Sequence, residues 1–208
     1  MAIETEIKFT VPKRELFDTI LSLKDIAGYK TSDIGLITIS DTYFDTPDNL
    51  LFKEKVVFRL RTAGKKPILT FKSQQKSSGS FFKRLEIESP AEITADEIVS
   101  GSFPEIPPCR AFFEKFGHVP LTVSLKAENN RRKILLEKND IQHFELVLDD
   151  VIFIGPRGTY PICELEVESL DGTDGELEKI GAWLKGRFDL QYAGPSKYIL
   201  GMKKVGTA

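Results

Sequence analysis

Charged side chains stand at every second position in two segments of this chain, where a strand usually carries apolar ones. Residues 4–8 read ETEIK, and residues 164–168 read ELEVE. Successive side chains of a strand point to opposite faces of the sheet, so each segment lines one face with carboxylates. Carboxylates held side by side disfavour one another's ionisation unless a cation lies between them. The two segments therefore predict strands that bind a metal ion or a cationic ligand.

The length and composition predict one domain with nearly equal numbers of acidic and basic residues. The chain has 208 residues, 41% of them hydrophobic, so we expect a single domain over residues 1–208. A net charge of −2 argues against sequence-independent binding of nucleic acid. Cys109 and Cys163 lack metal-site spacing, and no signal peptide or bilayer-spanning apolar stretch is visible. We therefore expect a cytoplasmic protein that contacts neither nucleic acid nor membrane.

Hydrophobic periodicity predicts mostly strands. Alternation favours strands over residues 2–10, 36–45, 55–62, 68–73, 81–89, 119–127, 130–137, 141–153 and 160–169. About four helices are expected: one after Pro12, short ones within 94–117 after a capping box at Thr94, and one from Thr173. The polar stretch 74–80 is expected to be a mobile loop. With no βαβ rhythm, the chain is predicted to be α+β and mainly antiparallel.

Basic residues also share strand faces, and they come from many separate segments. The candidates are Lys8, Arg59, Arg61, Lys72, Lys83 or Arg84, Arg131 to Lys133, and Lys197. In a closed or nearly closed sheet such faces would converge on one lumen. Mg²⁺ and Mn²⁺ prefer carboxylate oxygens and bridge to phosphates, and arginine grips phosphate with a planar fork. The segregated charges therefore predict a divalent cation held against a polyphosphate chain.

Each of these motifs alone is weak evidence, because antiparallel sheets often expose one charged face to water. Same-sign pairs at spacing two recur on several strands, however, and like charges on neighbouring strands destabilise a sheet unless something compensates them. In the basic run 131–133, alternation turns Arg131 and Lys133 one way and Arg132 the other. We expect one of these faces in the lumen and the other in solvent.

The same segments resemble the CYTH domain, the triphosphate tunnel metalloenzyme superfamily, over nearly the whole chain. The ETEIK segment resembles the ExExK signature of this family. The matching elements follow in the family's order, at residues 4–8, 43–47, 59–61, 69–72, 83–86, 148–149, 164–168 and 195–197. Residues 160–166 and the final helix are most similar to the bacterial inorganic triphosphatase branch. Some relatives carry an arginine shortly after the Ser-Lys pair at 196–197; here Tyr198 to Leu200 stand instead, so other cations such as Lys203 would grip the far phosphate.

The resemblance implies a closed barrel of about eight antiparallel strands around a charged tunnel, and hydrolysis of a triphosphate with Mg²⁺ or Mn²⁺. The implied metal ligands are Glu4, Glu6, Asp149, Glu164 and Glu166. The implied phosphate-binding residues are Lys8, Arg59, Arg61, Lys72, Arg84, Arg131 and Lys197. Glu4, Glu6 and Lys8 form the expected catalytic group, while the roles of Glu86, Glu88 and Glu168 stay open.

Four alternative functions are consistent with these residues. Inorganic tripolyphosphate is the leading substrate, with pyrophosphate and phosphate as products. A class IV adenylate cyclase would need a base pocket at the tunnel mouth, and a thiamine triphosphatase would need an aromatic or acidic site for the thiazolium. A non-catalytic polyphosphate- or nucleotide-binding module would gain nothing from paired carboxylates without metals. The oligomeric state stays open, with a homodimer among the alternatives.

Overall fold

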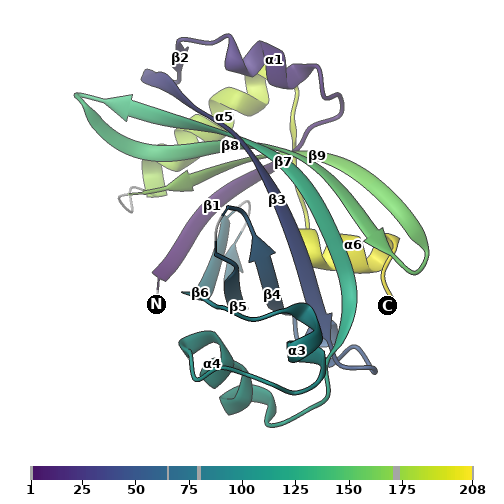
Figure 1. Ribbon diagram of the computed structural model, residues 1–208. Helices are drawn as coiled ribbons and strands as arrows, with labels where there is room; N and C mark the ends of the chain where they lie inside the picture. Colours follow the sequence, from purple (N-terminus) through teal and green to yellow (C-terminus); the bar gives the residue numbers. More distant parts are fainter. Residues whose placement is uncertain (1, 65, 79–80, 171–173, 208) are drawn as a thin grey trace.

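The computed structural model describes residues 2–64, 66–78, 81–170 and 174–207, with side chains described except at 2–4, 74–78, 81–84 and 174. Within these ranges it has ten strands and six helices (Figure 1). The strands are β1 Ala2–Thr10, β2 Asp25–Ile26, β3 Tyr29–Asp45, β4 Val56–Thr62, β5 Ile68–Ser78, β6 Phe81–Pro90, β7 Thr122–Lys138, β8 Ile141–Gly155, β9 Gly158–Ser169 and β10 Gln191–Tyr192. The helices are α1 Leu16–Leu21, α2 Leu50–Lys53, α3 Ala95–Val99, α4 Pro107–Phe116, α5 Asp174–Phe188 and α6 Lys197–Lys204.

All the strands join one antiparallel sheet, as the sequence predicted. The strand order is β10-β1-β6-β5-β4-β3-β7-β8-β9, with β2 paired to β3. β1 pairs with three strands: residues 2–7 pair with β6, residues 6–10 pair with β9, and Phe9 and Thr10 also pair with β10. Strands β6 and β9 flank β1 together only at Glu6 and Ile7, and the sheet of described strands is not closed into a barrel. The prediction of a closed eight-stranded barrel is therefore wrong, as is the prediction of about four helices.

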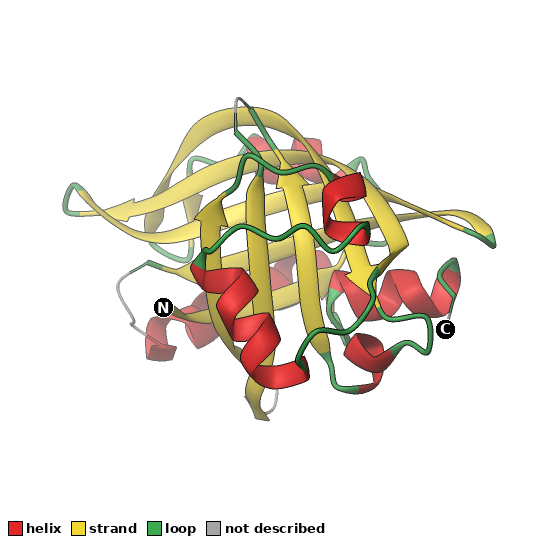
Figure 2. Ribbon diagram, turned by 60° about the horizontal axis from the view of Figure 1, so that its bottom comes forward, coloured by secondary structure: helices red, strands yellow, loops and turns green. Residues whose placement is uncertain are grey.

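Strand alternation sorts apolar side chains onto the outward faces of this curved sheet. Apolar residues of β1, β8 and β9 pack under α1 and α5. Those of β4 and β5 pack under α4 and against Ile98 of α3 (Figures 1 and 2). Helix α6 differs, because its Tyr198 and Met202 pack on Val151 and Phe153, which share the inward face of β8 with Asp149. Helix α6 therefore lies against the inner side of the sheet.

Several predicted element boundaries change. The two strands expected at 119–127 and 130–137 form the single strand β7, which begins only at Thr122. Strand β5 continues through most of the expected loop to Ser78, while residues 79–80 lie outside the described ranges. Helices α2 and α6 were not predicted. The capping box is confirmed: the Thr94 hydroxyl accepts from the Glu97 backbone N–H, and the Glu97 carboxylate accepts from the Thr94 N–H. None of the described helices has the length and apolar character needed to cross a membrane.

The packing of α6 leaves no room for a side chain at Gly201. A Cβ there would lie 2.4 Å from Leu125 Cδ2 and 2.9 Å from Phe153 Cδ1. We expect Gly201→Ala to destabilise the protein by about 1–3 kcal/mol, because the helix must shift off the sheet. Gly186→Ala in α5, where nothing lies within 4 Å, should stabilise it by about 1 kcal/mol at most. Denaturant unfolding of both variants checks this, and equal stabilities would contradict the packing argument.

Candidate active site

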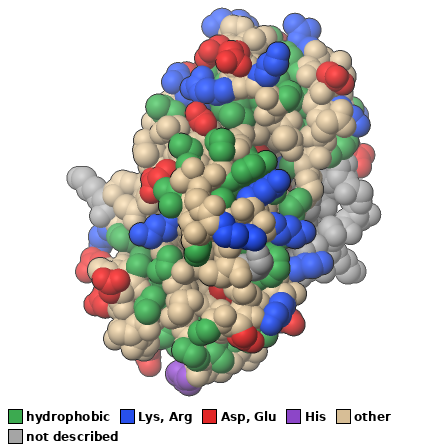
Figure 3. Space-filling view, turned by 90° about the vertical axis from the view of Figure 1, so that its right-hand side faces the viewer, with side chains coloured by type: hydrophobic (Ala, Val, Ile, Leu, Met, Phe, Trp, Pro, Cys, Tyr) green, Lys and Arg blue, Asp and Glu red, His purple; other side chains and the backbone are tan. Residues whose placement is uncertain are grey.

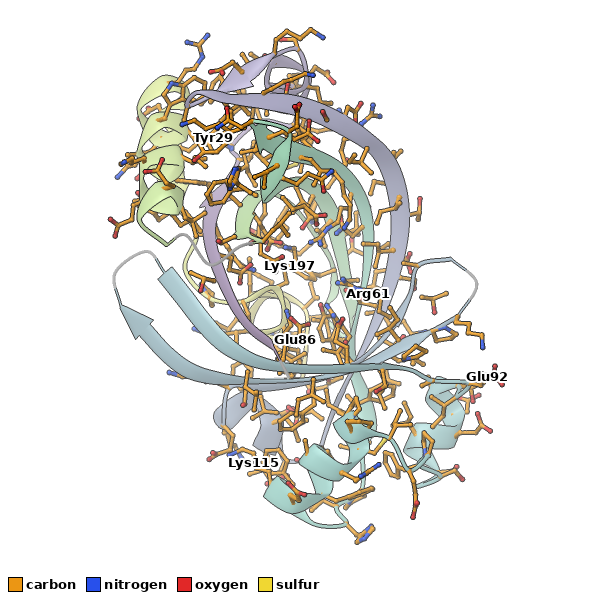
Figure 4. The ribbon with its side chains drawn as sticks, turned by 90° about the vertical axis from the view of Figure 1, so that its left-hand side faces the viewer. Tyr29, Arg61, Glu86, Glu92, Lys115 and Lys197 are labelled. Carbon is orange, nitrogen blue, oxygen red and sulfur yellow. The ribbon has the colours of Figure 1, made fainter. Side chains whose placement is uncertain are left out.

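The inward strand faces enclose a cavity of about 710 Å³ whose walls are strongly charged. Its cationic lining residues include Lys8, Arg59, Arg61, Lys72, Arg131, Lys133 and Lys197. Its acidic lining residues are Glu6, Glu86, Glu88, Glu145, Glu166 and Glu168. Figure 4 shows Arg61, Glu86 and Lys197 inside the space that the curved strands surround, whereas Glu92 and Lys115 lie outside it. Charges of both signs, from strands far apart in sequence, thus meet in one cavity.

Three buried carboxylates, Asp149, Glu164 and Glu166, surround a single ammonium group; we call them the acidic cluster. Nζ of Lys197 lies 2.9, 2.8 and 2.6 Å from their respective oxygens. Arg131 donates two hydrogen bonds of 2.6 Å to Asp149 and one of 3.0 Å to Glu166. Lys8 reaches Glu166 at 2.5 Å and Glu6 at 3.4 Å. Within the described residues, this end of the cavity is a dense network of ion pairs.

The surrounding cations keep Asp149 and Glu166 ionised despite their burial. Burial alone would raise the pKa of Asp149, but Lys197 and Arg131 outweigh it and lower that pKa below its ordinary value. The pKa of Glu166 is likewise well below its usual range, because Lys197, Lys8 and Arg131 outweigh burial. Burial lowers the pKa of Lys197, yet the three carboxylates together raise it well above normal. Asp149, Glu166 and Lys197 are therefore charged at neutral pH.

The register of β1, β9 and β8 places carboxylates in a row across the cavity wall. Glu6 stands opposite Glu168, and Glu168 stands opposite Glu145 on its other side. In the adjacent row Lys8 stands opposite Glu166. Directly opposed side chains have Cβ atoms about 4.5–5.5 Å apart, so like charges there need compensation. Part of it comes from Lys133, whose Nζ lies 2.8 Å from Glu145.

A second ion-pair group lies on β3 to β6 and includes a residue that the sequence analysis missed. Asp41 is buried and accepts two hydrogen bonds from Arg61, at 2.8 and 2.9 Å, while Arg59 lies 3.6 Å away. Burial raises the pKa of Asp41, but the two guanidinium groups outweigh it and lower that pKa. Arg59 also contacts Glu88 at 3.4 Å, and Lys72 contacts Glu86 at 2.8 Å. Asp41 shares a strand face with Tyr43 and Asp45, and that alternation was the signal available in the sequence.

The structure brings most of the predicted site residues together. Six of the seven predicted phosphate-binding residues line the cavity, namely Lys8, Arg59, Arg61, Lys72, Arg131 and Lys197. Among the predicted metal ligands, Glu6 and Glu166 line the cavity, while Asp149 and Glu164 are buried beside Lys197. The backbones of Glu4 and Arg84 pair directly between β1 and β6, but their side chains lie outside the described part of the structure.

The orientation of the basic run 131–133 is resolved. Arg131 and Lys133 line the cavity. Arg132 points away and forms an ion pair with Asp33, and both side chains are about two-fifths exposed, at 37% and 41%. The strand β7 therefore presents two cations to the cavity and one to the outer surface.

Lysines in or next to the two unpredicted helices extend the cavity's positive charge. Lys53, Lys55 and Lys203 line it on the side of α2 and α6. Neither Lys55 nor Lys203 forms an ion pair with a described residue, whereas the deeper cations all do. Figure 3 shows Lys and Arg side chains gathered across the middle of the face that carries α6. Lys203 lines the cavity, and its contact with the far phosphate stays a prediction.

Asp45 fixes both of these helices to the end of β3. Its carboxylate is fully buried and accepts hydrogen bonds from the backbone N–H groups of Thr46 and Leu51 at 2.7 Å and of Phe52 at 3.0 Å. It also accepts a 2.6 Å hydrogen bond from the Tyr198 hydroxyl. Tyr198 directly follows Lys197, so this one carboxylate sets the position from which Lys197 reaches the acidic cluster.

The donor chemistry fits a hard divalent cation, although the present arrangement does not offer a finished site. Among the described residues, no group of three Asp, Glu, His or Cys side chains is placed to share a metal ion. In the acidic cluster, the space between the carboxylates is taken by the Lys197 ammonium. Oε2 of Glu164 is buried and accepts no hydrogen bond from a described group, even with Nζ of Lys197 at 2.8 Å. These oxygens suit Mg²⁺ or Mn²⁺ once that ammonium moves.

Comparisons with known proteins agree with this picture. The CYTH domain family model matches residues 2–197. An inorganic triphosphatase of Haemophilus influenzae is 26% identical over 176 residues, which are 81% of this chain and 47% of that protein. The chain thus spans about half the length of the curated relative it matches.

Solved structures share the fold at low sequence identity. A putative adenylyl cyclase from Hippeastrum, described as having a dominant triphosphatase activity, gives a TM-score of 0.70 at 16% identity over 97% of this chain and 96% of that one. A putative adenylate cyclase from Bacillus halodurans gives a TM-score of 0.64 at 16% identity over 95% and 96% of the two chains. At these identities the likeness establishes the fold alone.

Proposed function

Because the chain belongs to the CYTH domain family, we propose that it is a divalent-metal-dependent triphosphatase that hydrolyses inorganic tripolyphosphate to pyrophosphate and phosphate. The observation that carries this proposal is the cavity, whose lining includes ten Lys and Arg side chains and six carboxylates. A polyanion accounts for the cations but not for the carboxylates, and a metal ion accounts for the carboxylates but not for the cations. A metal-bound polyphosphate accounts for both. We further propose that residues 1–208 act as a single domain.

The cations would bind and orient the phosphate chain. Arg59 and Arg61 present forked donors, and Lys72 a point charge, from β4 and β5. Lys8, Arg131 and Lys197 approach from β1, β7 and α6, and we propose the same role for Arg84. Phosphoryl transfer depends mainly on such positioning and on neutralising charge, so no protein nucleophile is required.

The carboxylates would hold the divalent ion and handle the proton of the attacking water. Glu4, Glu6, Asp149, Glu164 and Glu166 are the proposed ligands of Mg²⁺ or Mn²⁺. When bound, such an ion neutralises phosphate charge and lowers the pKa of a coordinated water. Glu6 lines the cavity beside Lys8, and we propose that it accepts a proton from the water that attacks the terminal phosphorus.

One feature of the cavity favours a second candidate function. Phe52, Val57 and Ile199 give it an apolar wall on the side of α2 and α6. Such a wall suits a nucleobase better than an inorganic phosphate chain. An adenylate cyclase that forms cAMP from ATP is therefore the alternative to be tested beside the triphosphatase.

A substrate panel tests the proposal. Purified protein is incubated with tripolyphosphate, ATP or thiamine triphosphate, each with Mg²⁺, with Mn²⁺ or with excess EDTA, and phosphate, pyrophosphate and cAMP are measured. We expect the fastest phosphate release from tripolyphosphate, and no release in EDTA. Formation of cAMP with pyrophosphate would replace the proposal by the cyclase, and faster release from thiamine triphosphate would change the substrate. Tight binding without turnover would leave only a binding module.

A further inference from the structure

The side chain of Lys197 occupies the centre of the acidic cluster rather than its edge. Its Nζ contacts one oxygen from each of Asp149, Glu164 and Glu166, all within 2.9 Å. The Lys197 side chain is 12% exposed, and the three carboxylate side chains are 0%, 3% and 9% exposed. Three anionic oxygens thus converge on one buried ammonium, and carboxylate oxygens are the donors that a hard divalent cation prefers.

The cations around this cluster already compensate most of its charge. Its three carboxylates, together with Glu6 at 3.4 Å from Lys8, face three cations among the described residues: Lys8, Arg131 and Lys197. A divalent cation added to these four anions and three cations would leave an excess positive charge in a buried place. Uncompensated buried charge is strongly unfavourable, so the metal ion alone has little to gain by entering.

The ammonium can leave while the helix stays in place. Helix α6 is held by the Tyr198–Asp45 hydrogen bond, by the Ser196 side chain that caps its first turn, and by the apolar contacts of Tyr198 and Met202. Lys197 itself lines the cavity, and its flexible four-carbon stem lets Nζ swing without backbone motion. An anion in the cavity would offer it oxygens to replace those of the cluster.

We propose that Lys197 is an internal counter-cation that holds the place of the divalent ion and gives it up only when a polyanion in the cavity binds its ammonium. This rests on the proposed function, because it assigns the coupling between metal and phosphate at the same site. Metal ion and phosphate chain then bind cooperatively, each assisting the other by the same factor. Without a polyanion in the cavity, the protein binds divalent cations only weakly.

The decisive measurement is the affinity of the protein for Mn²⁺ in the absence of any phosphate compound. The concentration of free Mn²⁺ is measured by electron paramagnetic resonance. Lys197→Met removes the charge and keeps an unbranched side chain, so it should bind Mn²⁺ about tenfold or more tightly than the wild type, within the usual range of coupling between sites. Sulfate, a tetrahedral anion that chelates Mn²⁺ weakly, should tighten Mn²⁺ binding by the wild type and should change it little in the variant.

A matched variant separates this effect from the general loss of a positive charge. Lys133→Met removes a cation from the same cavity, but Lys133 contacts Glu145 rather than the acidic cluster. It should change Mn²⁺ affinity by about twofold or less. Where Lys197→Met does not fold, Lys197→Gln, which keeps a hydrogen-bond donor among the carboxylates, takes its place. A purely structural role of Lys197 predicts weaker metal binding in either variant, not tighter.

The outcomes also separate this inference from the proposed function. If the Lys197 variants bind Mn²⁺ no more tightly than the wild type, the internal counter-cation is refuted, even if the wild type hydrolyses tripolyphosphate. If Mn²⁺ binding tightens in these variants while the wild type hydrolyses no triphosphate, the counter-cation stands and the proposed activity falls. An equal gain in the Lys133 variant would reduce the effect to bulk charge and overturn the inference.

Discussion

Glu166→Gln is expected to lower the rate of tripolyphosphate hydrolysis about 100- to 1,000-fold, the loss typical when one charge-stabilising group is removed from a catalytic site. Glu166 is the acid that contacts all three neighbouring cations, with Lys8 at 2.5 Å, Lys197 at 2.6 Å and Arg131 at 3.0 Å. Glutamine keeps the size of the side chain but carries no charge, so it neither binds a divalent ion well nor orients those cations. Steady-state rates with saturating Mg²⁺ measure the effect.

Glu128→Gln provides the matched control for this experiment. Glu128 lies on β7 but is exposed, and it accepts a hydrogen bond from Ser40 on the neighbouring strand. The same change in chemistry on the outer face of the sheet should leave the rate within about twofold of the wild type, as surface substitutions usually do. Thermal unfolding confirms that both variants are folded. A near-normal rate for a folded Glu166→Gln protein would remove this residue from the site.

Asp45→Ala should cost about 3–5 kcal/mol of folding free energy, the largest stability loss that we expect from any single substitution described here. The variant leaves three backbone N–H groups and the Tyr198 hydroxyl without their common acceptor in a fully buried place. Because these groups belong to α6 and to the segment that begins α2, both helices should loosen together. Urea unfolding gives the free energy, and hydrogen exchange of the Leu51 and Phe52 amides locates the change.

Asp48→Ala is the control for Asp45, three residues further on. The Asp48 side chain is 71% exposed and lies 3.9 Å from Lys53, a separation at which surface ion pairs contribute little. Its loss should cost about 1 kcal/mol or less. Tyr198→Phe, which removes one of the four donors to Asp45, should fall between the two. If Asp45→Ala and Asp48→Ala destabilise the protein equally, the buried carboxylate does not anchor the helices.

Alternation made part of this site predictable from the sequence. In β4, Arg59 and Arg61 line the cavity while Phe58 and Leu60 enter an apolar cluster, as period two requires. In β9 the same rule turns Glu166 inward and Leu165 and Val167 toward α5. Such patterns are local, so the face predicted for each residue stays correct even when the predicted strand order is wrong.

Features that depend on distant contacts were missed. Asp41 and Asp45 read as polar residues in a strand that ends at a turn, and only their burial against Arg61 and Tyr198 gives them a role. Helix α6 is eight residues long and contains Gly201, so its own propensity is poor. Its stability comes from packing on β7 and β8, which no local pattern reports.

The sheet also departs from the regular barrel because β1 changes partner along its length, from β6 to β9. Strand alternation specifies which face each side chain occupies but not which strand lies next to it. Which strands become neighbours depends on the whole set of pairings. The prediction of a closed eight-stranded barrel came from the family resemblance and not from any strand pattern in this sequence.

The outward packing of the apolar clusters, on the opposite side of the strands from most of the charged cavity, has an evolutionary consequence. Neighbouring residues along a strand are under different constraints, because one lines the cavity and the next packs against the helices outside. Selection can therefore retune what the protein accepts by changing every second residue, while the intervening ones keep the scaffold intact. Changes in cavity specificity can therefore arise without a prior loss of stability.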